Sequence, residues 1–216
     1  MSKQPHLAFL LGLVTLMGAC APRVAAPLPE PVEPLPPPQA AAPRDCYDAL
    51  TRMGAKFEAR QPFGAQQGCS VAEPVMLERA TIALSRPALM TCSLAHALAA
   101  FEREVIQPAA QRHFNRPVQQ IVHFGAFNCR PQTGRADRIS EHGFGRAIDI
   151  GGFELGGNIR ISVRDHWRDR GPRGNFLREV AQGACRHFNM VLTPKTDAAH
   201  QAHFHLDIGR FKRCDA

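Results

Sequence analysis

Apolar side chains recur at helical spacing in two segments of the chain. The segment 92–114 carries one apolar stripe, and Pro108 is expected to end or kink the helix that this stripe predicts. The segment 175–188 shows the same spacing and predicts a second helix, and a shorter helix is predicted over residues 46–55. The first stripe consists of Leu94, Leu98, Phe101, Val105 and Ile106, and the second of Phe176, Leu177, Val180, Ala184 and Phe188.

Segments with β-branched and alternating apolar residues predict strands over residues 119–124, 146–153, 159–163 and 203–208. Glycines and glutamines before Gly68 predict a loop. The apolar segment 75–83 is short, and it is bounded by Pro74 before it and Pro87 after it. Because helices come mostly before or between the strands, we expect an α+β fold with helices flanking a small antiparallel sheet.

The first 19 residues have the features of a signal peptide. Lys3 precedes an apolar run over residues 7–17, which is shorter than the roughly 20 residues that span a bilayer. Small residues then lead to Cys20, as in a bacterial lipobox, so we expect Cys20 to be lipidated. The alternative is an ordinary secretory signal in which Cys20 is incidental. Ala21 favours an outer-membrane lipoprotein facing the periplasm; without lipidation the protein would be secreted or periplasmic.

Residues 20–44 form the expected linker between anchor and domain. Nine of the chain's 18 prolines lie between residues 21 and 43, and such a segment cannot form a regular helix or a packed core. It predicts a semi-rigid tether to a single domain over residues 45–216. The net charge of +7 favours an acidic wall polymer or anionic lipid over nucleic acid in an exported protein, or it reflects only a basic solvated surface.

The chain holds seven cysteines, and lipidation of Cys20 leaves an even number. Export places them in an oxidising compartment, which favours three disulfides, although buried free thiols are the alternative. Six cysteines allow fifteen pairings, and the sequence does not choose among them. The wide spacing, with no CxxC, argues against a thiolate zinc site. The disulfide candidates are Cys46, Cys69, Cys92, Cys129, Cys185 and Cys214.

Two clusters carry candidate chemistry. In the first, Ser140 and His142 precede Asp149 by a spacing of S-x-H-x6-D, and Asp149 lies in an apolar strand where its charge needs a metal ion or an arginine as partner. The second runs from His200 to Asp207. If it is a strand, His203, His205 and Asp207 share one face.

Imidazole and carboxylate ligands fit zinc, and a catalytic zinc takes three protein ligands and leaves a fourth position for water. His142, Asp149 and His205 together supply such a set. We therefore predict one Zn²⁺ per chain on the face of the sheet. A second imidazole nearby could accept the water's proton.

The two motifs resemble those of zinc peptidases that include D-alanyl-D-alanine carboxypeptidases, murein endopeptidase and the hedgehog domain, which bind zinc on a small antiparallel sheet. Residues 46–210 resemble more closely the bacterial extensin-like C-terminal domain family. The stretches that carry this resemblance are 68–69, 105–110, 128–130, 140–150, 183–185 and 203–207.

The resemblance implies roles for single residues. His142, Asp149 and His205 would be the zinc ligands, Arg130 would bind a substrate carbonyl or oxyanion, and Ser140 would orient the site. The carboxypeptidases place a glutamate base where this chain has Ala202. The pattern His-x-x-His-x-His instead matches the murein endopeptidase and favours His203 as general base, assisted by His200.

The sequence thus favours a zinc-dependent peptidase, more an endopeptidase than a carboxypeptidase, that acts on peptidoglycan peptides in the cell envelope. A non-catalytic, metal-containing wall-binding or scaffolding lipoprotein is the alternative, because fold does not settle function. A structural zinc site closed by four protein ligands is a third possibility.

Overall fold

The computed structural model describes residues 43–64 and 67–216. The predicted signal peptide (1–19), the lipidation site Cys20 and the linker up to residue 42 lie outside the described residues. Among the helices that are described, none is long and apolar enough to cross a bilayer.

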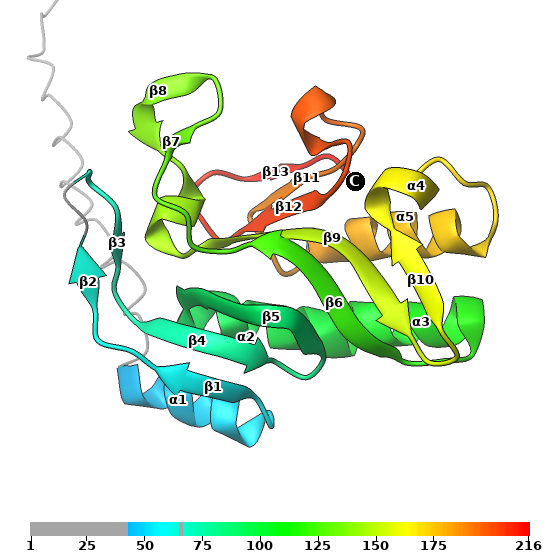
Figure 1. The fold of residues 1–216 in the computed structure, drawn as a ribbon, viewed down its shortest axis with the longest axis horizontal. Helices are drawn as coiled ribbons and strands as arrows, with labels where there is room; N and C mark the ends of the chain where they lie inside the picture. The colour runs from blue at the N-terminus through cyan, green and yellow to red at the C-terminus, as the bar shows by residue number, and fades with distance from the viewer. Residues whose placement is uncertain (1–42, 65–66) are drawn as a thin grey trace, which may run out of the picture. The chain divides into compact units, whose positions relative to one another are not determined.

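One large mixed sheet forms the framework of the described residues (Figure 1). Nine strands within 43–64 and 67–216 take part, in the order β1-β4-β5-β6-β9-β12-β11-β13, with β10 also paired to β9. Their bounds are β1 Lys56–Ala59, β4 Pro74–Arg79, β5 Ala83–Thr91, β6 Val118–Gly125, β9 Ala147–Leu155, β10 Ile159–Ser162, β11 Met190–Leu192, β12 Phe204–Asp207 and β13 Arg213–Cys214.

Two short hairpins stand apart from this sheet. Strand β2 (Phe63–Gly64) pairs with β3 (Ser70–Val71), and β7 (Pro131–Gln132) pairs with β8 (Arg135–Ile139). Figure 1 shows the β7–β8 hairpin rising from the sheet on the side where β11, β12 and β13 lie.

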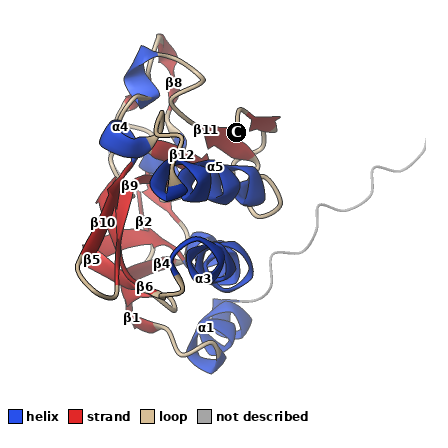
Figure 2. Cartoon of the chain, turned by 90° about the vertical axis from the view of Figure 1, so that its right-hand side faces the viewer, coloured by secondary structure: helices blue, strands red, loops and turns tan. Residues whose placement is uncertain are grey.

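Helices cover one face of the sheet, as the view in Figure 2 shows for α3 and α5. The interface is apolar because the two stripes predicted from the sequence are buried there. The helices are α1 Pro43–Arg52, α2 Cys92–Phe101, α3 Gln107–Phe114, α4 Val163–His166 and α5 Pro172–Ala184.

The long helix predicted over residues 92–114 is interrupted just before Pro108, as the proline predicts. A π-helical turn (Glu102–Ile106) separates α2 from α3, and Pro108 lies in the first turn of α3. Proline has no N–H to donate and its ring clashes with the preceding turn, so the wider π turn relieves both constraints.

Three disulfides link distant parts of the described chain, as the cysteine count predicts. Cys46–Cys92 joins α1 to the start of α2, and Cys185–Cys214 joins the end of α5 to β13. Cys69–Cys129 joins the segment between β2 and β3 to the loop that follows β6. This third disulfide therefore fixes the loop that comes to lie beside the candidate site.

The sheet corrects the expected fold in size and in strand direction. It is larger than the small sheet predicted, and it is mixed because β5 pairs with β6, and β11 with β13, in parallel. Strand β1 lies in the segment predicted as loop. The apolar segment 75–83 forms most of β4 and the start of β5. Strand β5 tolerates Pro87 because its pairing with β6 is confined to Ala83 and Leu84, and its pairing with β4 is irregular between Ala83 and Ala88.

Candidate metal centre

A short 3₁₀ helix (Glu141–Phe144) positions His142. Ser140 caps this helix, because its hydroxyl oxygen accepts a hydrogen bond from the backbone N–H of His142 at 3.4 Å. Gly145 ends the helix with φ of 63°, a left-handed conformation that glycine adopts without strain. The chain then enters β9, which carries Asp149.

Asp149 and His205 face each other across two central strands. Strands β9 and β12 pair antiparallel, and their register places His205 directly opposite Asp149. Directly opposed residues of an antiparallel pair point to the same face, so the two side chains meet. Phe204 and Leu206 alternate with His205 and are buried in the core, as the sequence predicts.

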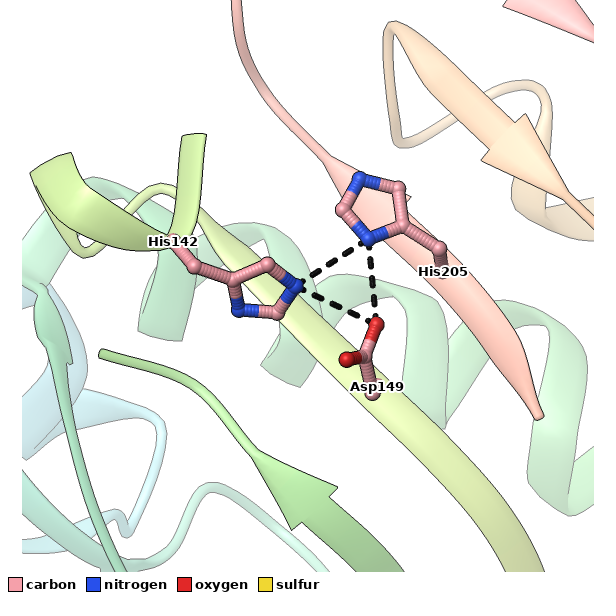
Figure 3. A group of neighbouring side chains, drawn as sticks. All are labelled: His142, Asp149 and His205. Atoms are coloured by element: carbon pink, nitrogen blue, oxygen red, sulfur yellow. Dashed lines mark hydrogen bonds and ion pairs between the residues drawn. The ribbon is translucent and has the colours of Figure 1, made fainter. Parts of the chain in front are cut away.

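The three predicted ligands converge on one point (Figure 3). Oδ1 of Asp149 lies 3.2 Å from Nε2 of His142 and 3.0 Å from Nδ1 of His205, and these two nitrogens are 3.1 Å apart. Within the described residues, these side chains form a group whose ligand atoms all lie within 4.8 Å of one another. Two imidazoles and a carboxylate are a donor set suited to zinc.

The remaining ring nitrogens are held by partners outside the group. Nδ1 of His142 donates to the carbonyl oxygen of Ala126 at 2.5 Å, and Nε2 of His205 donates to Oδ2 of Asp207 at 3.1 Å. Such bonds set the tautomer and orientation of metal-binding histidines. Nε2 of His142 then faces both Oδ1 of Asp149 and Nδ1 of His205, and a cation placed among these three atoms would be bound by all of them.

The electrostatics of the group also favour a positive charge. Burial alone would raise the pKa of Asp149, but polar contacts with His142 and His205 outweigh it and hold this pKa well below its usual range. Burial would lower the pKa of His205, but its hydrogen bonds with Asp149 and Asp207 outweigh burial and raise it. An imidazolium at His205 thus lies between two carboxylates, and a metal ion would compete with that proton for Nδ1.

His203 lies next to the three convergent side chains without belonging to them. Its Nε2 is 3.6 Å from Oδ1 of Asp149, and its ring packs edge-on against Phe124. Burial lowers the pKa of His203, and the nearby imidazoles add to this effect while Asp149 opposes it. The ring of His200 lies 5.3 Å from that of His203, and its Nδ1 is 2.7 Å from a carboxylate oxygen of Asp197.

A cavity of about 270 Å³ opens beside this cluster. Its lining includes four residues predicted from the sequence, namely Arg130, Ser140, His200 and His205. The guanidinium of Arg130 contacts only neutral groups of the described residues, the carbonyl oxygen of Pro131 and the hydroxyl of Thr133, and so remains available to a ligand. The structure therefore brings all the predicted site residues of the domain into one region.

Sequence reasoning missed the groups that orient the ligands. The alternation of β12 placed Asp207 on the face of His205, which was the signal for its role as hydrogen-bond acceptor. No sequence signal identifies the Ala126 carbonyl, because a backbone acceptor depends only on the path of the chain. Asp197 was also missed; it caps the 3₁₀ helix Ala198–His200 and contacts the His200 ring.

Comparison with known proteins gives one family. The family model described as Extensin-like protein C-terminus matches residues 44–215, which is most of the chain. No curated protein and no solved structure gives a significant match to the chain.

Proposed function

The chain belongs to the extensin-like C-terminus family, and we propose that it is a zinc-dependent endopeptidase that cleaves peptidoglycan peptides in the cell envelope. One observation carries this proposal: ligand atoms of His142, Asp149 and His205 converge within 4.8 Å, beside a cavity that His205 itself lines. The resemblance of the two motifs to zinc peptidases supports it.

The three side chains fit zinc in their number, in their chemistry and in the hydrogen bonds that orient their rings. Three protein ligands leave a coordination position free, and Ala126 and Asp207 hold the ligand imidazoles in the required tautomers. A zinc ion held by these residues would supply Lewis acidity and would lower the pKa of a water molecule in the site to about 7. Among described residues His203 does not join the convergent group, which favours an open catalytic site over a closed structural one.

His203 is suited to the role of general base. A base must reach the proton that it accepts, and Nε2 of His203 lies 3.6 Å from the carboxylate oxygen at the centre of the group. Because burial lowers its pKa, His203 is neutral and able to accept a proton at neutral pH. It takes a proton from the attacking water and returns it to the amine that leaves when the peptide C–N bond breaks. His200 assists, because its own imidazole ring lies beside that of His203.

Arg130 and Ser140 serve the reaction from the cavity side. Arg130 contributes a positive charge to the wall that His205 shares, where it can bind the substrate carbonyl or the oxyanion that forms on attack. Ser140 positions the site rather than attacking substrate, because its hydroxyl caps the helix of His142.

The envelope assignment is supported by the N-terminal sequence. The signal peptide, Cys20 lipidation site and proline-rich linker predict a lipoprotein of the outer membrane whose domain extends into the periplasm. Peptidoglycan is the polymer within reach of such a tether. The net charge of +7 suits a domain that binds an acidic polymer.

The test compares three variants of the purified protein in zinc content and in digestion of peptidoglycan. His205→Ala should lose both zinc and cleavage, because it removes a ligand. His203→Gln should keep about one zinc per chain and lose cleavage, because it removes only the base. His96→Ala, an exposed histidine on α2, is the matched control and should keep both.

Each alternative gives a distinct result. Zinc bound at His205 with no peptide product from wall material of several compositions would identify a non-catalytic wall-binding protein. Full cleavage by His203→Gln would remove His203 from the mechanism. Failure of the wild-type protein to bind zinc after reconstitution would refute the proposal.

A further inference from the structure

The cavity beside the candidate metal centre has an uneven charge distribution. Its acidic residues are already occupied: Glu141 pairs with Arg146, while Asp197 and Asp207 contact His200 and His205. Two of its arginines are different. Arg130 and Arg138 line the cavity, yet neither forms an ion pair with any carboxylate of the described residues.

Arg138 is held in place by an aromatic ring instead of by an anion. It lies at the end of β8, and its guanidinium stacks on Phe211 with 4.6 Å to the ring centroid. Arg210 stacks on the same ring at the same distance. A guanidinium that lies over an aromatic ring is positioned without an anion, so its N–H groups remain able to donate to one.

This arrangement places cationic groups in the cavity wall where they can bind an anion. Two guanidinium groups that contact one ring add positive charge beside the cavity, and a carboxylate on the ligand would be attracted to it. Arginine binds carboxylates with two parallel hydrogen bonds, which makes the contact both strong and selective. The partially buried position of Arg138 lowers solvent screening compared with a fully exposed arginine.

We propose that this cavity is a carboxylate subsite, in which Arg138, fixed by Phe211 and assisted by Arg130, selects acidic peptides with a free carboxylate close to the scissile bond. The inference rests on the proposed function and names its substrate class. The cavity has a volume of about 270 Å³, which accommodates a group of one or two amino acids, and its wall includes both His205 and Arg138. The carboxylate of the bound peptide would lie beside the bond that is cleaved and would not be a metal ligand.

The test uses binding rather than turnover, with the full chain kept free of zinc by a chelator. The probes are synthetic stem peptides, acetyl-L-Ala-γ-D-Glu-L-Lys-D-Ala-D-Ala, with either free carboxylates or carboxamides at the glutamate and the C-terminus. We expect the wild-type protein to bind the acid form about tenfold more tightly than the amide form, as one charge-assisted hydrogen-bond pair at a partly exposed site provides. Higher salt should reduce this preference.

Variants assign the preference to the cavity. Arg138→Gln should bring the ratio of acid to amide affinity close to one, and Phe211→Leu should lower it in part because the guanidinium loses its support. Arg103→Gln, an exposed arginine on the helical face, should keep the full ratio. The singly amidated peptides then show which carboxylate is bound.

Equal affinity of the wild-type protein for acid and amide, or an unchanged ratio in Arg138→Gln, overturns the subsite. These results are independent of catalysis. An acid preference that Arg138→Gln abolishes, in a protein that cleaves no peptide, keeps the subsite and refutes the peptidase. Cleavage of peptides by a protein that shows no acid preference refutes the subsite and keeps the peptidase.

Discussion

Asp207 offers the sharpest test of how the site is built. Its carboxyl group is buried; Oδ2 accepts a hydrogen bond from His205 at 3.1 Å and Oδ1 accepts one from the backbone N–H of Gly209 at 2.8 Å. Asp207→Asn preserves the shape but leaves one acceptor oxygen for two donors. Whichever way the amide turns, either His205 or Gly209 faces an N–H group, and the fixed charge beside the imidazole is lost.

The expected cost follows from that lost contact. A hydrogen bond to a charged group contributes about 1.5–3 kcal/mol, and partners of metal-ligating histidines change metal affinity by about 10–100-fold. We therefore expect Asp207→Asn to bind zinc about 10–100-fold more weakly, which is about 1.4–2.7 kcal/mol. The variant should remain folded, because its volume is unchanged.

Competition between the protein and a chromophoric chelator measures this affinity. Asp137→Asn is the matched control, since Asp137 is an exposed carboxylate whose ion pair, within residues 43–64 and 67–216, is with Arg135. Urea unfolding of the zinc-free proteins separates a loss of ligand orientation from a loss of stability. If Asp207→Asn binds zinc as tightly as the wild type while His205→Ala does not bind it, the orienting role of Asp207 is refuted.

Two further predictions concern the framework. Burial, which outweighs hydrogen bonds from Thr81 and Ile82, raises the pKa of Glu102 from its usual 4.5 to about 7. The folded protein therefore holds this proton more tightly, so the contribution of Glu102 to stability is fully present below about pH 4.5 and falls by about 3 kcal/mol as the pH rises from 4.5 to about 7. Glu102→Gln should flatten that slope in urea unfolding; an unchanged slope would contradict the assignment. The Cys69–Cys129 disulfide closes a loop of 60 residues, so replacing both cysteines by serine should cost about 4 kcal/mol in unfolding free energy. Because the bonded loop also carries the Ala126 carbonyl, zinc affinity should fall too, and unchanged affinity in the folded variant would exclude this link.

The sequence predicted that His142, Asp149 and His205 lie together, because the position of each depends on local rules. Alternation along β12 separates His205 from the buried Phe204 and Leu206. The glycines around His142 predict the bend that returns the chain to β9. A charged Asp149 in an apolar strand requires a compensating partner, and a metal ion shared with the histidines of both motifs is one partner that the sequence allows.

Other features depend on tertiary pairing, which local patterns do not encode. Strand β1 has little alternation, and it forms because β4 offers an edge to pair with. Strand β13 has two residues and exists through its parallel pairing with β11. The stacking of Arg138 on Phe211 joins residues more than 70 positions apart, so neither residue alone predicts the cationic wall of the cavity.

The most direct test of the central claim is the anomalous scattering of zinc in crystals of the zinc-loaded protein. The account predicts one site, bound by Nε2 of His142, Oδ1 of Asp149 and Nδ1 of His205 at about 2.0–2.2 Å, with the fourth position facing the cavity. A zinc ion with His203 as a fourth protein ligand would mean a closed structural site. Such a site, or the absence of zinc from these three residues, would contradict the account.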